Sequence, residues 1–393
     1  MLINELRSEL SAFRERGLHR QRRLIASPHG RHVNVDGRSL LNFCGNDYLG
    51  LANDPRIRDA FKRGIDHWGA GAGAAHLVCG HTAAHHELEY ALADFTQRES
   101  ALLFVNGYAA NVGTIKALLS EGDQVIQDRL NHASLLDGGW LSRAELRWFS
   151  HRNYAELDKV LAETDHRNYR RRLVVSDGVF SMDGDCCDVD RLVGVADTHD
   201  AIVMIDDAHG IGVLGSDGEG LVDPAVHSAQ HVPVLMCTLG KAFGCAGAFV
   251  AGDRELIEFL IHKARNYVYS TAMPAALAAA SLRSLEIVRS EGWRRELLKQ
   301  HIAYFRAGAA QLGLPLSPSS TPIQPLLLED ANRALFYAEQ LEARGFLIRA
   351  IRPPTVPPNT ARLRITLTAN HQRDDVDLLL NALQSIQAQE LDG

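Results

Sequence analysis

The chain has 393 residues, of which 46% are hydrophobic and 23% charged, and its formal net charge is −7. This length predicts one large and one smaller domain with a sizeable core, and the composition is that of a globular protein. The negative charge disfavours a general nucleic-acid binder, because such proteins gain affinity from lysine and arginine facing phosphates. We therefore expect a small-molecule substrate.

The sequence predicts no secretion signal and no membrane span. Residues 1–17 alternate acidic and basic side chains at helical spacing and lack the apolar core of a signal peptide. The longest apolar runs, such as residues 275–280, are far shorter than the roughly 20 residues that cross a bilayer. The cysteines form no C-x-x-C pair, so we expect no metal site and no disulfide framework. These features predict a cytoplasmic protein.

Between about residues 100 and 252, short apolar runs alternate with segments of helical period. The apolar runs are ALLFVN, DQVIQD, RLVVSDGVF, AIVMIDDA, VLMCTL and GAFVAG. This alternation predicts an α/β domain whose mostly parallel sheet is buried on both faces.

After about residue 290 the pattern changes. Amphipathic stretches at 291–312, 331–344 and 371–389 flank the strand-like runs IQPLLLED, FLIRAIR and ARLRITLT, which predicts a smaller α+β domain. The proline-rich segment 352–358 is predicted to be a rigid loop, because proline lacks an amide hydrogen. We divide the chain into an N-terminal helix with a small-domain segment (1–50), a cofactor-binding α/β domain (51–288) and a C-terminal α+β domain (289–393).

Asp206 directly follows four apolar residues, which places a carboxylate at the end of a buried strand, where open α/β sheets bind ligands. A buried carboxylate needs a partner, and the pyridine nitrogen of pyridoxal 5'-phosphate (PLP) is one whose protonation makes the ring an electron sink. His209, three residues on, is close enough to contact the 3'-oxygen of the same ring. Alone, Asp206 also fits a helix N-cap, and His209 a loop histidine with a local hydrogen bond.

Lys241 follows the next apolar strand and lies between Gly240 and Gly244. Small neighbours let a planar cofactor approach the backbone, and Schiff-base chemistry requires a partly desolvated amine with a lowered pKa. A lone lysine in a glycine-rich turn is more often solvated. In combination with Asp206, the pattern predicts that Lys241 is a catalytic lysine carrying PLP as a Schiff base.

Two other strand ends offer candidate cofactor contacts. Segment 106–111 puts a glycine turn between an apolar strand and an apparent helix, whose first amides can hold a phosphate. Many strand-to-helix turns share this pattern. His132 follows a further strand end, where it either stacks on a cofactor ring or is an ordinary loop histidine.

Several blocks, in this order, resemble those of the α-oxoamine synthases, PLP enzymes of the aspartate-aminotransferase fold (fold type I). The blocks are NDYLGL (46–51), GY (107–108), NHAS (131–134), GVFSMDGD (178–185), DDAHG (206–210), TLGK (238–241) and YSTAMP (269–274). The resemblance implies a PLP-dependent acyltransferase and a homodimer. The chain departs from the family pattern at Ala72, Ala74, Ala75 and Cys79, where serine is common.

The resemblance also implies a role for each matched residue. Lys241 would form the Schiff base and act as a base, Asp206 would bind the pyridine nitrogen, and His132 and His209 would contact the ring. The implied phosphate and cofactor contacts are Gly107, Tyr108, Ser181 and Thr238, with Ser270 and Thr271 reaching the partner subunit's phosphate. The implied substrate contacts are Asn46 and Arg364 at the amino-acid carboxylate, His132, and Arg20 and Thr355 at the acyl chain.

Within the family, segments 350–357 and 360–368 resemble members that join L-alanine to a pimeloyl thioester of CoA or acyl carrier protein in biotin synthesis. A basic cluster near the start of the sequence either docks the anionic donor or forms a solvated helix face; it comprises Arg14, Arg16, His19, Arg20, Arg22 and Arg23. One alternative is a sister synthase that uses glycine or serine with another acyl-CoA. A second is a catalytically silent regulator or binding module, against which the intact Lys241, Asp206, His132 and Arg364 argue.

Overall fold

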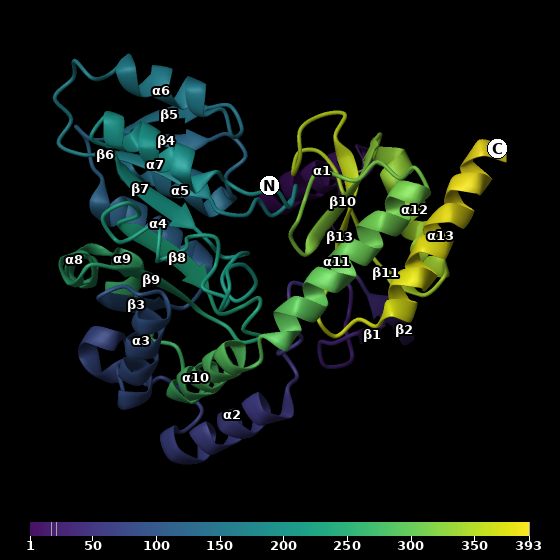
Figure 1. The fold of residues 1–393 in the computed structure, drawn as a ribbon, viewed down its shortest axis with the longest axis horizontal. Helices are drawn as coiled ribbons and strands as arrows, with labels where there is room; N and C mark the ends of the chain where they lie inside the picture. The colour runs from purple at the N-terminus through teal and green to yellow at the C-terminus, as the bar shows by residue number, and fades with distance from the viewer. Residues whose placement is uncertain (17, 21, 393) are drawn as a thin grey trace.

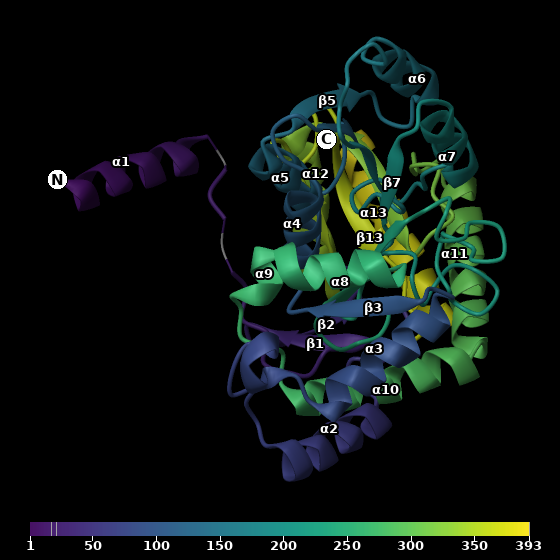
Figure 2. The same cartoon turned by 90° about the vertical axis from the view of Figure 1, so that its left-hand side faces the viewer.

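The computed structural model describes residues 1–16, 18–20 and 22–392. Figure 1 shows two lobes side by side, one containing a large twisted sheet and the other the three C-terminal helices. Helix α1 (Leu2–Glu15) points away from both lobes in Figure 2, and none of its residues is buried. No helix in the described part of the chain is long and apolar enough to cross a membrane.

The large lobe is built on a seven-stranded sheet in the order β3-β9-β8-β7-β6-β4-β5. Strand β9 is antiparallel to both of its neighbours, and the other pairs are parallel. The strands are β3 (Ser100–Phe104), β4 (Gln124–Asp128), β5 (Glu145–Phe149), β6 (Arg172–Asp177), β7 (Ile202–Asp206), β8 (Val234–Thr238) and β9 (Ala248–Gly252). The predicted mostly parallel sheet is confirmed. Strand β5 was not predicted, because it lies at the edge of the sheet and most of its side chains are only half-buried.

Helices cover both faces of this sheet, so alternate residues of a strand enter different cores. In β7, Val203 and Ile205 belong to one apolar cluster and Met204 to the other. The first cluster takes in α3 (Ala83–Phe95), α6 (Tyr154–Ala162), α7 (Val189–Thr198) and α10 (Ala275–Ser290). The second takes in α4 (Gly107–Leu118), α5 (Ala133–Ser142), α8 (Arg254–Lys263) and α9 (Arg265–Val268). Helix α2 (Pro55–Trp68) packs on α10, and the short η1 (His76–Gly80) precedes α3.

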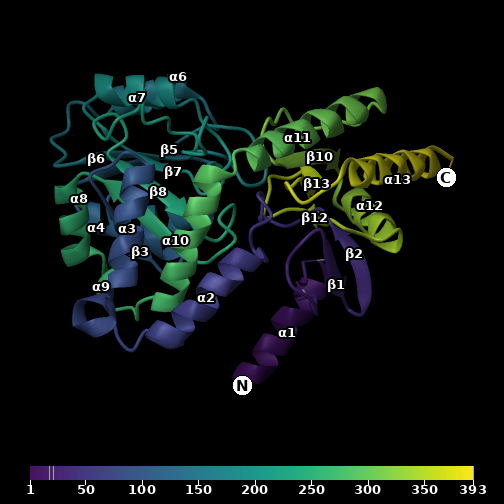
Figure 3. The ribbon, with the colours of Figure 1, turned by 60° about the horizontal axis from the view of Figure 1, so that its bottom comes forward.

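The small lobe combines two three-stranded sheets with helices α11 (Trp293–Gln311), α12 (Ala331–Ala343) and α13 (Arg373–Asp392). One sheet is antiparallel and consists of β10 (Ile323–Glu329), β13 (Ala361–Thr366) and β12 (Arg349–Ile351). The other joins β1 (His32–Val35) and β2 (Arg38–Asn42) to β11 (Phe346–Leu347). Figure 3 shows β1 and β2 beside the C-terminal elements. The first apolar cluster continues into this lobe through Phe305, Tyr337 and Leu383, so the two lobes share a core.

The run FLIRAIR, predicted as one strand, forms two. Its first half pairs in parallel with β2, and its second half pairs antiparallel with β13. The change of sheet occurs at Ile348, which is buried. No local sequence pattern indicates this division, because the partner strand β2 comes from the other end of the chain. The predicted proline-rich loop is confirmed, and it connects β12 to β13.

Candidate active site

Three parallel strands of the large sheet end at one edge, and each ends in a polar residue. Strand β6 ends at Asp177, β7 at Asp206 and β8 at Thr238. Asp177 and Asp206 are direct neighbours in register. A turn after β8 then carries Lys241 to the same edge, as the sequence predicts.

The turn after β8 is packed too tightly for any residue but glycine at position 244. Gly244 has φ of +62°, and a Cβ there would lie 2.3 Å from the backbone nitrogen of Ala52. The left-handed conformation and the close approach both require glycine. The strand end and this packed turn therefore fix the position of Lys241.

A cavity of about 310 Å³ lies at this edge and is lined by residues of both lobes. Six predicted site residues line it: Asn46, His132, Ser181, His209, Lys241 and Arg364. Four lining residues were not predicted: Cys44, Met182, Arg349 and Ile351. The cavity thus brings together a lysine, two histidines and two arginines from segments far apart in the chain.

Lys241 is half-buried at the wall of this cavity. No hydrogen bond or ion pair joins its amine to any residue that the structure describes. Burial lowers the pKa of Lys241 to about 8, although the neighbouring Asp206 and Asp177 carboxyls oppose the shift. The neutral, nucleophilic form of the amine is therefore far more populated near neutral pH than in an ordinary lysine.

Asp206 is held by a chain of hydrogen bonds that also fixes His132. One Asp206 oxygen accepts from Asn111 Nδ2 at 2.7 Å and the other from the backbone nitrogen of Ala208 at 3.0 Å. Asn111 also contacts Ser134 Oγ at 2.8 Å, and Ser134 Oγ contacts His132 Nδ1 at 2.7 Å. Residues 208–213, which follow Asp206, form turns, so Asp206 does not cap a helix. His132 caps α5 and lines the cavity as well.

A second network joins Arg364 to His209. Arg364 Nε donates to the backbone oxygen of Ser181 at 2.6 Å, and its Nη2 donates to Asn46 Oδ1 at 3.1 Å. The Tyr48 hydroxyl lies 3.2 Å from Asn46 Oδ1 and 2.7 Å from His209 Nδ1. Burial, together with the positive charge of Lys241 and Arg364, lowers the pKa of His209 well below its usual value. His209 is therefore a neutral imidazole at physiological pH.

Four residues that hold the predicted site residues were not predicted from the sequence: Asn111, Ser134, Tyr48 and Asp177. Asp177 accepts from the backbone nitrogen of His132 at 2.5 Å, and burial and the nearby Asp206 raise its pKa well above the usual value. Its signal was present, since Asp177 ends an apolar strand just as Asp206 does. Asn111 is a polar residue on a mostly apolar, buried helix, and this pattern could have indicated it. The sequence does not distinguish Tyr48 from a tyrosine of the hydrophobic core.

Three predicted phosphate and cofactor contacts, Gly107, Tyr108 and Thr238, do not line this cavity. Gly107 and Tyr108 begin α4, and Asn106 caps this helix by accepting from the backbone nitrogen of Ala109 at 2.8 Å. The Tyr108 hydroxyl contacts Asp137. Thr238 Oγ1 donates to the backbone oxygen of Gly247 at 3.0 Å. Gly107 and Tyr108 follow the end of β3, and Thr238 ends β8, so all three lie at the same edge of the sheet as Asp206.

Ser270 and Thr271 lie outside the lining of the cavity, in the segment after α9. Thr271 is exposed and forms an isolated bridge with Ala75. The alanine-containing segment 71–76 therefore lies against the segment that the resemblance assigns to the partner's phosphate. A role for Ser270 and Thr271 in a dimer stays a prediction.

Arg20 and Thr355 line a neighbouring cavity of about 750 Å³, which α1 and the proline-rich loop also border. The structure divides the basic cluster. Arg23 is ion-paired with Asp36 at 2.7 Å and with Glu342 at 2.8 Å, whereas His19 and Arg20 line the cavity. Only part of the cluster therefore faces a space that an acyl donor can occupy.

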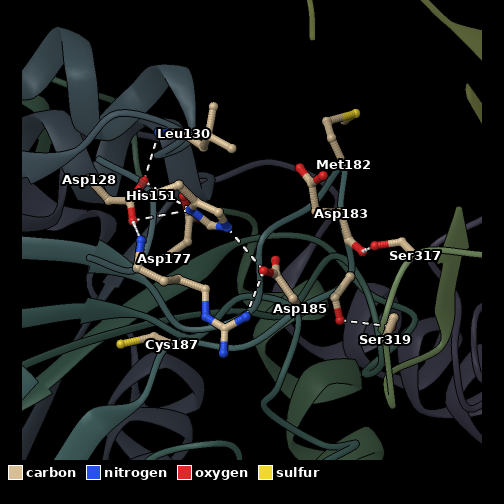
Figure 4. A network of polar contacts seen from close by, with 12 residues as sticks. Asp128, Leu130, His151, Asp177, Met182, Asp183, Asp185, Cys187, Ser317 and Ser319 are labelled. Carbon is tan, nitrogen blue, oxygen red and sulfur yellow. Dashed lines mark hydrogen bonds and ion pairs between the residues drawn. The ribbon is translucent and has the colours of Figure 1, made fainter. Parts of the chain in front are cut away.

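The segment that carries Ser181 is held between the two lobes (Figure 4). From the large lobe, His151 bridges Asp128 at 3.1 Å and Asp185 at 2.9 Å. From the small lobe, Ser319 Oγ donates to the backbone oxygen of Gly184 at 2.7 Å. A Cβ at Gly184, which has φ of +71°, would lie 2.3 Å from the backbone oxygen of Ile323. The segment is thus fixed from both sides.

His151→Gln is expected to destabilise the protein in a pH-dependent way. Burial lowers the pKa of His151, but Asp128 and Asp185 outweigh it and raise the pKa to about 9. The imidazolium therefore contributes fully below the unfolded-state pKa of 6.5 and loses its contribution as the pH rises through about 9. We expect the variant to lose roughly 2 to 3 kcal/mol of unfolding free energy at pH 6 and little above pH 9.5.

Urea unfolding of the two proteins at several pH values measures this difference. The exposed His166 is a matched control, and His166→Gln is expected to change stability little at any pH. A His151→Gln deficit that stays constant from pH 6 to pH 10 would contradict the assignment of the effect to the imidazolium charge.

The fold and the site together indicate the class of protein. The model of the family described as aminotransferase class I and II matches residues 38–383. The chain belongs to this family.

Its curated relatives specify the group within the family. The 8-amino-7-oxononanoate synthase of Pseudomonas syringae pv. tomato is 54% identical over 97% of this chain and 95% of its own length. Among solved structures, a serine palmitoyltransferase from S. paucimobilis with bound PLP-myriocin aldimine has a TM-score of 0.90 at 27% identity, covering 97% and 96% of the two chains. The 8-amino-7-oxononanoate synthase of Francisella tularensis has a TM-score of 0.77 at 28% identity, covering 90% and 99%. The predictions of the fold, the family and a PLP cofactor are confirmed.

Proposed function

We propose that the chain catalyses the decarboxylative condensation of L-alanine with pimeloyl-CoA or pimeloyl-acyl carrier protein. The products are 8-amino-7-oxononanoate, carbon dioxide and the free thiol, and the reaction belongs to biotin biosynthesis. One observation carries the proposal. This chain is similar to enzymes named 8-amino-7-oxononanoate synthase, and one of its cavities contains both Lys241, whose pKa is lowered, and Arg364, which is hydrogen-bonded to Asn46.

The residues at the sheet edge fit PLP. Lys241 presents an amine without a partner among the described residues, and Asp206 presents a buried carboxylate for a pyridine nitrogen. The start of α4 offers backbone amides to a phosphate, because the first amides of a helix have no partner within it. The residues that would hold the cofactor are Gly107, Tyr108, His132, Ser181, Asp206, His209, Thr238 and Lys241. When bound, PLP withdraws electrons from the α-carbon of the amino acid.

The remaining roles follow from the side chains of this chain. Arg364, oriented by Ser181 and Asn46, binds the alanine carboxylate through its planar guanidinium. Lys241 removes the α-proton as a general base, a role that its lowered pKa favours. The hydrogen bonds to Ser134 and Tyr48 fix the orientations of His132 and His209. Arg20 and Thr355 bind the acyl substrate in the neighbouring cavity.

The assembly and the domain division are part of the same proposal. We infer a cytoplasmic homodimer in which Ser270 and Thr271 reach the partner's phosphate. We retain residues 51–288 as the cofactor-binding domain, with 1–50 and 289–393 forming the small-domain parts. His19 and Arg20 are the members of the basic cluster that face the acyl donor.

A direct assay tests the proposed reaction. Release of thiol from pimeloyl-CoA is measured with L-alanine, glycine and L-serine, and mass spectrometry identifies the product. We expect kcat/KM to be at least about tenfold higher with L-alanine, the size of effect that one methyl or hydroxyl group produces in a fitted site. A preference for glycine or serine would instead identify a sister synthase. Repeating the assay with pimeloyl-acyl carrier protein distinguishes the two donors.

A further inference from the structure

Arg349 lies next to Arg364 in the small lobe. The two are directly opposed residues of the antiparallel pair β12 and β13, so their side chains leave the same face of the sheet. Both line the catalytic cavity. Like charges directly opposite each other destabilise a sheet, and a bound anion reduces this repulsion. Two arginines facing one cavity therefore favour binding of an anion in addition to the amino-acid carboxylate at Arg364.

The guanidinium of Arg349 is available to such an anion. Among the residues that the structure describes, no hydrogen bond or ion pair engages it, and the residue is exposed. The nearby Glu342 is already occupied, because it accepts from two nitrogens of Arg23 at 2.8 and 2.9 Å. By contrast, Arg362 of β13 is ion-paired with Asp183. Arg349 therefore differs from Arg362 in lacking a carboxylate partner.

Arg349 also lies where two cavities meet. It lines the catalytic cavity with Lys241, and it lines the neighbouring cavity with Arg20 and Thr355. Apolar side chains form much of the wall of that second cavity: Leu10, Phe13, Leu18, Ile351, Pro353 and Pro354. A methylene chain that starts near Lys241 therefore finds an apolar surface and a cation along its path.

We infer that Arg349 binds the carboxylate at the far end of the acyl chain and so selects a dicarboxylic over a monocarboxylic acyl thioester. The inference rests on the proposed function and names a residue that determines its specificity. Arg364 takes the carboxylate of the amino acid, which leaves the acyl terminus as the second anion close to the reacting carbon. The phosphates of CoA are separated from the thioester by the pantetheine arm and lie farther from Arg364.

The test compares pimeloyl-CoA with heptanoyl-CoA, which has the same chain length and a methyl terminus. Dissociation constants are measured by calorimetry with the PLP-loaded protein, and KM values are measured with L-alanine. For Arg349→Gln we expect binding of pimeloyl-CoA to weaken by about tenfold to a hundredfold, the effect of losing a hydrogen bond to a charged group. Heptanoyl-CoA affinity and the KM for L-alanine are expected to stay within about twofold of the wild-type values.

Two further variants separate charge from fold. Arg349→Lys keeps the charge and is expected to retain a preference for pimeloyl-CoA. Arg63→Gln removes an exposed arginine from a distant groove between α2 and α10 and is expected to bind both thioesters as the wild type does.

The outcomes divide clearly. An equal loss of affinity for both thioesters would place Arg349 against the CoA moiety and overturn the inference. Unchanged discrimination in Arg349→Gln, or a wild-type protein that binds both thioesters equally, would overturn it too. Failure of the proposed function is a separate result, seen as no turnover of pimeloyl-CoA by the wild type.

Discussion

Lys241→Ala is expected to reduce turnover of pimeloyl-CoA and L-alanine by at least about 1,000-fold, within the range that loss of a general base produces. The reason is chemical, since alanine can neither bond to a cofactor aldehyde nor accept a proton. The same variant is expected to lack the visible absorbance of lysine-bound PLP. Absorbance spectra after reconstitution with PLP and a thiol-release assay measure the two effects.

Lys116→Ala is the matched control for this experiment. Lys116 is an exposed lysine in the last turn of α4, in the same lobe, and its replacement is expected to leave both spectrum and turnover unchanged. If Lys241→Ala kept its activity, or if the absorbance persisted, Lys241 would not be the catalytic lysine.

Asp206→Asn is expected to lower kcat by about 100-fold to 1,000-fold, comparable to removing one preorganised electrostatic group from an active site. The substitution keeps the size of the side chain but removes its negative charge, and the charge is what would hold a pyridine nitrogen protonated. Because Lys241 is intact, the variant should still develop the absorbance of lysine-bound PLP. Steady-state kinetics and absorbance spectra together separate loss of catalysis from loss of cofactor.

Asp253→Asn supplies the control for Asp206. Asp253 also follows directly on a strand, β9, but it is exposed and makes no side-chain cap hydrogen bond. We expect normal kinetics for this variant. Wild-type kcat in Asp206→Asn would show that the carboxylate charge has no part in the reaction.

The hydrogen-bond networks around Asp206 and Arg364 explain why the active site needs both lobes. The large lobe contributes Lys241 and Asp206 at the ends of parallel strands, whereas the small lobe contributes Arg364 from an antiparallel sheet. The segment around Ser181 lies between them, because Arg364 donates to its backbone and His151 anchors Asp185. A change in the relative position of the lobes would therefore alter the distance between the base and the bound carboxylate.

The centre of the site could be predicted from the ends of the apolar runs. An apolar run followed by a polar residue indicates where a buried strand stops, and this rule placed Asp206 and Lys241 at one sheet edge. The same rule applies to Asp177, which sequence reasoning passed over. This rule could not identify Tyr48, because the role of this tyrosine depends on hydrogen bonds to Asn46 and to His209, and His209 is far away in the chain.

The sequence by itself determined the alternation of strands and helices, the parallel sheet and the lysine and aspartate at its edge, because these depend on local periodicity and on chain order. Tertiary structure alone decided the split of FLIRAIR between two sheets and the placing of Arg349 opposite Arg364. It also decided that Arg23 is ion-paired while Arg20 faces a cavity. The physical reason is the same throughout: a side chain's partner comes from a distant segment, and only the packing of the lobes brings the two together.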